Sequence, residues 1–177
     1  NFRFGSFNHA RKLTTESIEL FSQVIKSTPG SQLMLKSVTF HEFEERERIR
    51  KKFESYGIMK EQLIMHEWVK GGLNHIKLYR EMDVALDPIP YGGATSSCEA
   101  LWMGVPIVTL AGRGMIGRLT STLLWHSGNQ EWIATNKEEY VNIAKSLFKK
   151  GIRGKRQREK LKGKVLSSHI GNPKLLV

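Results

Sequence analysis

The amino-acid sequence predicts an α/β fold, a Rossmann-like, doubly wound and mostly parallel sheet of about six strands with helices on both faces. Three observations carry this prediction. Segments of extended and helical character alternate along the chain with a repeat of about 25 to 30 residues. Residues 84–89 are nearly continuous in apolar character, which is typical of a strand covered on both faces. Right-handed crossovers then leave few other topologies.

The first half of the chain is interpreted as three strand–helix pairs. Strands are predicted at residues 2–7, 32–38 and 63–68, and helices at residues 14–26, 41–56 and 73–81. The first helix has apolar residues at helical spacing, which are Ile18, Leu20, Phe21, Val24 and Ile25. The segment Thr28-Pro29-Gly30-Ser31 breaks this helix, and the strongly charged second helix ends at Gly57.

The second half continues the same alternation. Strands are predicted at residues 84–89, 106–110 and 131–134, and helices at residues 96–103, 117–126 and 137–150, followed by a basic helix around residues 149–166. Internal repeats, low-complexity tracts and linkers are absent from the sequence. We therefore expect residues 1–177 to form a single domain.

Composition excludes several classes of protein. The chain has 177 residues, of which 40% are hydrophobic and 25% charged, the usual mix of a globular domain. Its one cysteine, Cys98, excludes a disulfide framework and a cysteine-based zinc site. Apolar runs fall well short of the roughly 20 residues that span a membrane. Because the first residue is Asn1 rather than Met, we expect the chain to be a piece of a longer protein. Because no basic-then-apolar leader follows, we expect that protein to be cytoplasmic and to have no membrane partner.

The net charge of +11 is concentrated in one segment. Residues 149–164 hold nine of the 28 Lys and Arg residues and one of the 17 Asp and Glu residues, which leaves 19 basic and 16 acidic residues elsewhere. A nucleic-acid-binding face would interleave such charges with aromatic residues that stack on bases, and this run has none. We expect a solvated helix here; the alternative function is a non-catalytic Rossmann-like module that binds nucleic acid or another anionic partner through this segment.

Loops that follow strands are where an open α/β sheet binds its ligands. The loop at residues 87–99 contains a glycine pair and then Thr95 and Ser96 at a helix start. The free N–H groups and the dipole of a helix start suit a phosphate, and hydroxyls can donate to its oxygens. Glu99, one turn after Thr95, could accept from the hydroxyls of a ribose. The alternative is that Ser96-Ser97-Cys98-Glu99 is a capping box, which needs no ligand.

Other loops carry weaker candidates. Lys12, after the first strand, could reach a diphosphate as a point charge or could be a solvated lysine. His75 lies near a helix start, without a second metal ligand at a matching spacing. Arg113 and Arg118, after the fifth strand, could meet an anion or only solvent. Cys98 is interpreted as a small buried helix residue, and no sequence typical of a nucleophile–base pair occurs.

Short strings along nearly the whole chain resemble a known family. The most specific is E-A-L-W-M-G-V-P at residues 99–106, and others are F-G-S-F-N at 4–8, M-D-V-A-L-D-P at 82–88, R-L-T-S-T-L-L at 118–124 and E-W-I-A at 131–134. Together they resemble the O-linked N-acetylglucosamine transferase/SPINDLY family, in a form that looks bacterial. The resemblance implies a GT-B glycosyltransferase, of which this chain is similar to the C-terminal, donor-binding lobe.

The resemblance also implies roles for particular residues. It makes Lys12 the catalytic residue that contacts the diphosphate and stabilises the leaving nucleotide. It implies contacts with the nucleotide sugar for five further residues: Thr95 and Ser96 on the diphosphate, Glu99 on the ribose, His75 in the nucleotide pocket, and His9 where animal members have a glutamine. Arg118 is added as a candidate loop contact.

The donor and the partners follow from the same resemblance. Ala94, Leu78 and Gly72 stand where animal members have His, Arg and Lys, and the family includes users of UDP-GlcNAc and of GDP-fucose, so UDP- and GDP-sugars both remain candidates. No cofactor and no metal are expected. The acceptor, a Ser or Thr hydroxyl of a protein, would be bound by the other lobe and a tetratricopeptide region, so we expect this chain alone to be inactive. A third interpretation is a degenerate lobe that is retained for interaction.

Overall fold

A six-stranded parallel sheet forms the centre of the computed structural model, which describes residues 1–151 and 154–175. Its strands are β1 (Phe2–Ser6), β2 (Ser31–Lys36), β3 (Leu63–His66), β4 (Val84–Leu86), β5 (Ile107–Leu110) and β6 (Ile133–Ala134). They lie in the order β3-β2-β1-β4-β5-β6, and every neighbouring pair is parallel. The predicted fold class is confirmed. The strand order changes direction between β1 and β4, which is the switch point of a doubly wound sheet.

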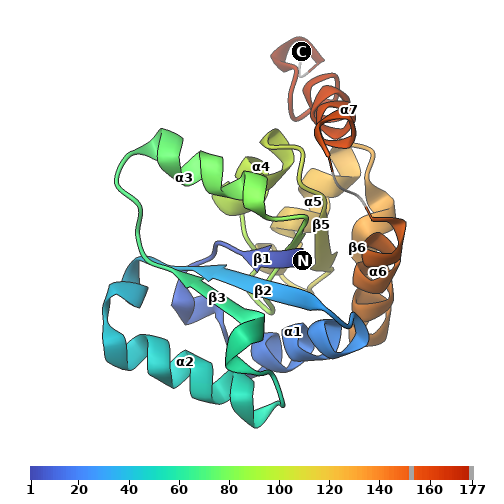
Figure 1. Cartoon of the computed structure of the whole chain (residues 1–177). Helices are drawn as coiled ribbons and strands as arrows, with labels where there is room; N and C mark the ends of the chain where they lie inside the picture. The colour runs from blue at the N-terminus through green and yellow to red at the C-terminus, as the bar shows by residue number, and fades with distance from the viewer. Residues whose placement is uncertain (152–153, 176–177) are drawn as a thin grey trace.

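Helices cover both faces of this sheet (Figure 1). They are α1 (Thr15–Ser27), α2 (Phe43–Ser55), α3 (Gly72–Leu78), α4 (Thr95–Trp102), α5 (Leu119–His126), α6 (Lys137–Lys150) and α7 (Lys155–Leu166). Helices α1 and α2 lie on one side of the sheet and α3 and α4 on the other, while α6 packs against α1 and α7 against α4 (Figure 1). Within the described ranges, none of these helices is both long and apolar enough to cross a membrane.

The core consists of two layers, one on each face of the sheet. Because successive side chains of a strand point to opposite faces, β4 contributes Val84 and Leu86 to the layer beneath α1 and α6. It contributes Ala85 to the layer beneath α4, α5 and α7. The apolar run predicted from the sequence is therefore a strand that is covered on both sides.

The basic segment differs from the expected solvated helix. Residues 152–153 of that prediction lie outside the described residues, and α7 begins only at Lys155. One face of α7 is buried, since Leu161 and Val165 belong to the second core layer. In addition, Arg158 donates to the carbonyl oxygens of Tyr79 and Met82. The expectation of a solvated helix is therefore wrong for this face, because its apolar side chains pack in the same core layer as residues of α4 and α5.

Candidate functional site

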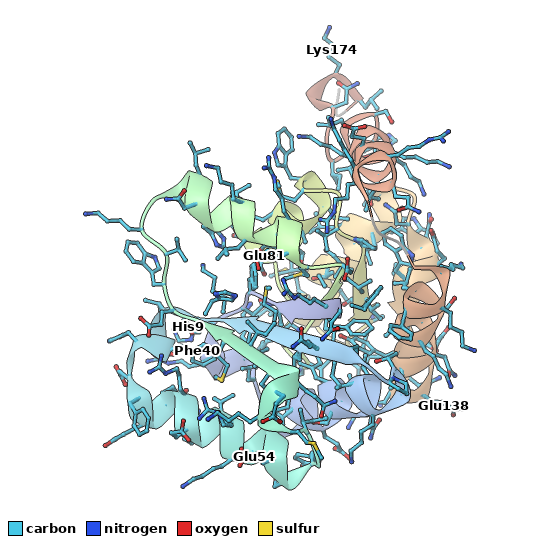
Figure 2. The ribbon with its side chains drawn as sticks, viewed as in Figure 1. His9, Phe40, Glu54, Glu81, Glu138 and Lys174 are labelled. Carbon is cyan, nitrogen blue, oxygen red and sulfur yellow. The ribbon has the colours of Figure 1, made fainter. Side chains whose placement is uncertain are left out.

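A cleft with a volume of ≈ 400 Å³ opens beside the switch point, at the carboxyl end of the sheet. The loop after β1, the end of β2, α3 and the first turn of α4 form its walls. Figure 2 shows one of its residues, His9, at this end of the molecule, well away from Glu138 on α6. The volume is within the range of small-molecule sites, which is about 300–1,000 Å³. Its lining includes six residues predicted from the sequence, which are His9, Lys12, His75, Thr95, Ser96 and Glu99.

Lys12 connects the two loops of the switch point. It ends a 3-10 turn after β1, and His9 Nδ1 accepts a hydrogen bond from the backbone N–H of Arg11 at 3.2 Å within that turn. The Lys12 ammonium donates to the carbonyl oxygen of Gly92 at 2.8 Å, in the loop after β4. The positive charge is thereby fixed at the floor of the cleft.

Asp87 shapes the loop after β4. Its buried carboxylate accepts from the Gly93 N–H at 2.6 Å and from the Thr109 hydroxyl at 2.7 Å. Burial raises the pKa of Asp87 to about 6, and these hydrogen bonds and the Lys12 charge only partly oppose that rise. A Cβ atom on Gly92 would collide with this carboxylate, so the glycine lets the loop fold over it. Our sequence reasoning missed Asp87, although an acidic residue at the end of an apolar strand was a usable signal.

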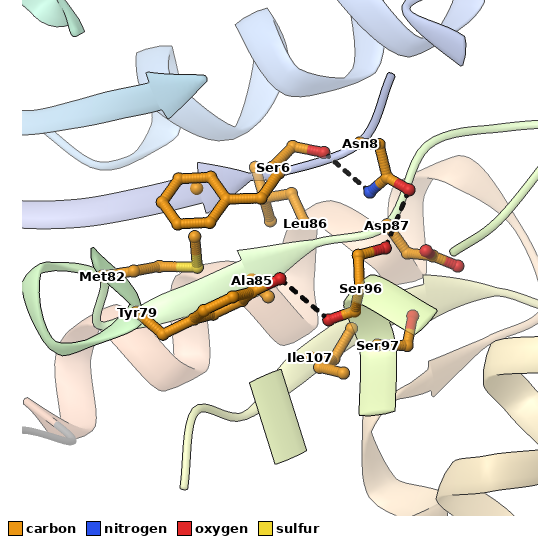
Figure 3. Close-up of a pocket in the computed structure, with 12 residues that line it drawn as sticks. Ser6, Asn8, Tyr79, Met82, Ala85, Leu86, Asp87, Ser96, Ser97 and Ile107 are labelled. Atoms are coloured by element: carbon orange, nitrogen blue, oxygen red, sulfur yellow. Dashed lines mark hydrogen bonds between the residues drawn. The ribbon is translucent and has the colours of Figure 1, made fainter. Parts of the chain in front are cut away.

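The first turn of α4 is tied to the loop after β1 by Asn8. The Ser96 hydroxyl donates to Asn8 Oδ1 at 2.9 Å, and Asn8 Nδ2 donates to the Ser6 hydroxyl at 3.3 Å (Figure 3). These residues enclose a void of ≈ 10 Å³ together with Tyr79 and Asp87 (Figure 3). Asn8 thus orients the helix start whose first N–H groups lack partners within the helix. Sequence reasoning did not single it out.

The capping-box alternative is wrong. Helix α4 begins at Thr95, so Ser96 is already inside the helix, and the N-cap is Ala94. The Glu99 carboxylate is directed to other elements instead. Its Oε2 accepts from the Tyr79 hydroxyl at 2.9 Å and lies 2.9 Å from His75 Nε2. With 23% of its side chain exposed, Glu99 forms part of the cleft wall.

His75 joins Glu99 to a residue that sequence reasoning missed, Lys36 at the end of β2. Lys36 Nζ lies 2.7 Å from His75 Nδ1. The Phe7 ring packs edge-on against Tyr79, with the ring centroids 4.8 Å apart. Burial, together with the Glu99 carboxylate, raises the pKa of Tyr79 far above its ordinary value, so its hydroxyl remains a donor. A lysine at the end of a strand next to the switch point was the available signal for Lys36.

Arg118 lies outside this cleft. Its Nε donates to the carbonyl oxygen of Gly112 at 2.9 Å. It lines a neighbouring hollow that also touches Thr95 and Cys98. The Cys98 thiol, expected to be buried, is exposed in that direction, because Ser97, Ala100 and Leu101 occupy the buried face of α4.

The cleft offers positive charge and hydroxyl groups. Lys12, Lys36 and the start of α4 are the groups that favour an anion there. In residues 1–151 and 154–175, no three His, Cys, Asp or Glu side chains are grouped to hold a metal ion.

Comparisons with known proteins give the family. The chain matches glycosyl transferase family 41 over residues 2–176. It is 32% identical over 144 residues to the Arabidopsis thaliana protein named "Probable UDP-N-acetylglucosamine--peptide N-acetylglucosaminyltransferase SPINDLY", a match that covers 81% of this chain and 16% of that protein. It is 26% identical to a Caenorhabditis elegans UDP-N-acetylglucosamine--peptide N-acetylglucosaminyltransferase, over 81% of this chain and 12% of that protein. The chain therefore spans less than a fifth of the length of these relatives.

Solved structures agree with this result. A mutant of Thermobaculum terrenum O-GlcNAc transferase superposes with a TM-score of 0.83 and 34% identity, over 93% of this chain and 31% of that chain. Anabaena HepE, solved in complex with UDP, shares the fold alone, with a TM-score of 0.67 and 14% identity over 99% of this chain and 48% of that chain. The parallel sheet and these matches show the fold of GT-B glycosyltransferases, and the chain belongs to glycosyl transferase family 41.

Proposed function

We propose that this chain is the nucleotide-sugar-binding lobe of a protein O-glycosyltransferase, which transfers a sugar from UDP-GlcNAc or a related donor to Ser or Thr hydroxyls. The main support is the meeting of Lys12, the start of α4 and Glu99 in one cleft at the switch point. The relatives' names, which specify a UDP-N-acetylglucosamine donor and a peptide acceptor, support the same reaction.

Lys12 and the start of α4 act on the diphosphate in this proposal. The acceptor oxygen bonds to the anomeric carbon, the hydroxyl proton is released, and the bond from that carbon to the diphosphate breaks. The electron pair stays on the leaving diphosphate, whose negative charge grows. The Lys12 ammonium, the first N–H groups of α4 and the Thr95 hydroxyl line the same cleft, so they can stabilise that charge.

Glu99 and His75 act on the nucleoside part of the donor. Glu99 Oε2 is engaged by Tyr79 and His75, which leaves Oε1 as an acceptor for a ribose hydroxyl. His75 and Trp68 both line the cleft, and their rings could pack against a base. Whether the base is uracil or guanine is the part of the proposal that the titration below decides.

The remaining parts of the proposal rest on the sequence. The acceptor protein would be bound by regions beyond this chain, including a tetratricopeptide region, so this lobe alone would not turn over. The protein would be bacterial and cytoplasmic, and the lobe would need no metal or cofactor.

Calorimetric titration with UDP, GDP and ADP near physiological salt tests this proposal. We expect saturable binding of UDP or GDP. Glu99→Ala should weaken it about tenfold or more, since a hydrogen bond to a charged group contributes about 1.5–3 kcal/mol. Lys12→Ala should also weaken it, because the point charge on the diphosphate is lost. Glu54→Ala is the matched control, since this exposed carboxylate on α2 lies away from the cleft (Figure 2).

A folded wild-type lobe that binds none of the three nucleotides at millimolar concentration would contradict the proposal. Salt-sensitive binding of DNA or heparin, lost when the exposed lysines of α7 are neutralised, would instead favour the polyanion-binding alternative.

A further inference from the structure

Three residues from three different elements form a continuous hydrogen-bonded chain along one wall of the cleft. Lys36 ends β2, His75 lies on α3 and Glu99 lies on α4. Lys36 Nζ is 2.7 Å from His75 Nδ1, and His75 Nε2 is 2.9 Å from Glu99 Oε2. Tyr79 adds a second hydrogen bond to the same Glu99 oxygen at 2.9 Å.

The chemistry of the three groups determines which atom donates and which accepts in each hydrogen bond. An ammonium group has three donors and no acceptor, so Lys36 must donate and His75 Nδ1 must accept. The proton of a neutral imidazole is then on Nε2, which donates to Glu99 Oε2. The hydrogen bonds therefore run from Lys36 through His75 to Glu99.

The partial burial of these side chains favours the pairing of Lys36 with His75. The side chains of His75 and Glu99 are only 20% and 23% exposed. Little water therefore competes for the ring nitrogens of His75 or for the Glu99 carboxylate. Burial lowers the pKa of Lys36, whereas the Glu99 carboxylate favours its charged form. The ammonium also lies over the Phe7 ring, 5.9 Å from its centroid, which holds it on the His75 side of the cleft.

We propose that Lys36 is a positioning residue for the ribose of the donor: it fixes the His75 tautomer, and through His75 it aims the Glu99 carboxylate at the ribose hydroxyls. This inference rests on the proposed function and adds to it a residue and a preference. The lobe should favour nucleotides with ribose hydroxyls, and Lys36 should be needed for that preference although it touches no ribose.

A comparison of two ligands separates this role from direct binding of phosphate by Lys36. The probes are the nucleoside diphosphate that binds the wild type and its 2′,3′-dideoxy analogue, which keeps the base and the diphosphate. The wild type should bind the analogue about tenfold more weakly, since one or more hydrogen bonds to a charged group are lost. Lys36→Met should weaken binding of the natural ligand about tenfold and that of the analogue little.

Two further variants control the comparison. Lys36→Arg, which keeps a cationic donor next to His75, should retain most of the preference for ribose. Lys51→Met removes an exposed lysine on α2 that lies outside the cleft lining, and it should bind both ligands as the wild type does.

Nitrogen-detected NMR of the ligand-free protein tests the tautomer directly. The His75 ring should carry its proton on Nε2 in the wild type and should lose this fixed state in Lys36→Met. A His75 proton on Nδ1, or equal weakening of both ligands in Lys36→Met, would overturn the inference. If the wild type binds no nucleotide, the proposed function fails, while the NMR result still decides whether Lys36 fixes His75.

Discussion

Asp87 is a carboxyl group that the fold keeps inside the protein, directly below the loop that leads to α4. Burial raises its pKa from 3.8 to about 6. Between pH 3.8 and about 6, the folded protein therefore keeps a proton on Asp87 that the unfolded chain has released. The contribution of Asp87 to stability is therefore fully present below about pH 4 and is lost as the pH rises through about 6.

Replacing Asp87 with Asn should remove this pH dependence. We expect the difference in unfolding free energy, wild type minus Asp87→Asn, to fall as the pH rises from about 4 to about 6, by at most about 3 kcal/mol. Urea unfolding of both proteins across this range measures the difference, and the other titrating groups cancel in it. A difference that rises with pH would show that the Asp87 carboxylate is stabilised by the fold.

The residues of the cleft divide into those that a loop position can reveal and those that need a partner from elsewhere in the sheet. Lys12, Thr95 and Glu99 were predictable because they follow β1 and β4, whose carboxyl ends meet at one edge. Lys36 contacts His75, which lies 39 residues away, and Tyr79 contacts Glu99, which lies 20 residues away. The pattern of a single sequence does not specify such pairs.

The bounds of an element were predicted well where clear start and stop residues mark its ends. They were predicted less well where a proline or a 3-10 turn ends a strand early. Helix α6 has the predicted bounds, with Asn136 accepting from the Glu139 N–H at its start and Gly151 in the left-handed region at its end. Strand β4 is shorter than predicted, ending at Leu86, since Pro88 and Pro90 have no N–H to donate to a ladder. Strand β2 ends at Lys36 because Ser37 begins a 3-10 turn.

Helix α7 is attached to the rest of the molecule by a basic residue and a glycine. Gly104 has a φ of +68° at the end of α4, and a Cβ atom there would collide with the backbone of Arg158. The guanidinium of Arg158 then donates to the carbonyl oxygens of Tyr79, Arg80 and Met82, which follow α3. Arg158 is one of the basic residues that suggest a polyanion site, but its guanidinium is bound to backbone carbonyl groups of this protein.

Replacing Arg158 with Met should detach this contact while keeping an aliphatic side chain of similar length. The unfolding free energy should fall by about 2 kcal/mol, since three carbonyl groups lose a charged donor. The Tm should fall by about 4–8 °C in a chain of this size. Thermal unfolding followed by circular dichroism measures this. Arg156→Met, which removes an exposed charge from the same helix, should leave the Tm nearly unchanged. Equal Tm values for the two variants would show that these hydrogen bonds add no stability.

The whole molecule is a sheet whose two halves meet at the pair of strands that come first and fourth along the chain. Right-handed crossovers leave few topologies for such an alternation of elements, which is why the doubly wound class could be predicted, whereas the strand order itself comes from the structure. The cleft exists only where β1 and β4 lie side by side. Two of the cross-links there are Lys12 to Gly92 and Asn8 to Ser96, which join residues 80 and 88 apart.

This separation has a consequence for the order in which the protein forms. Contacts between distant residues close large loops and are made late in folding, whereas helices form from local contacts. A chain longer than about 150 residues commonly folds through intermediates, so the two events can be resolved in time. During refolding from urea, the far-ultraviolet helical signal should recover before the capacity to bind a fluorescent nucleotide. Simultaneous recovery would mean that β1 and β4 pair as early as the helices form. With the expected delay, the ability to bind a ligand reports that the central pair of strands has closed.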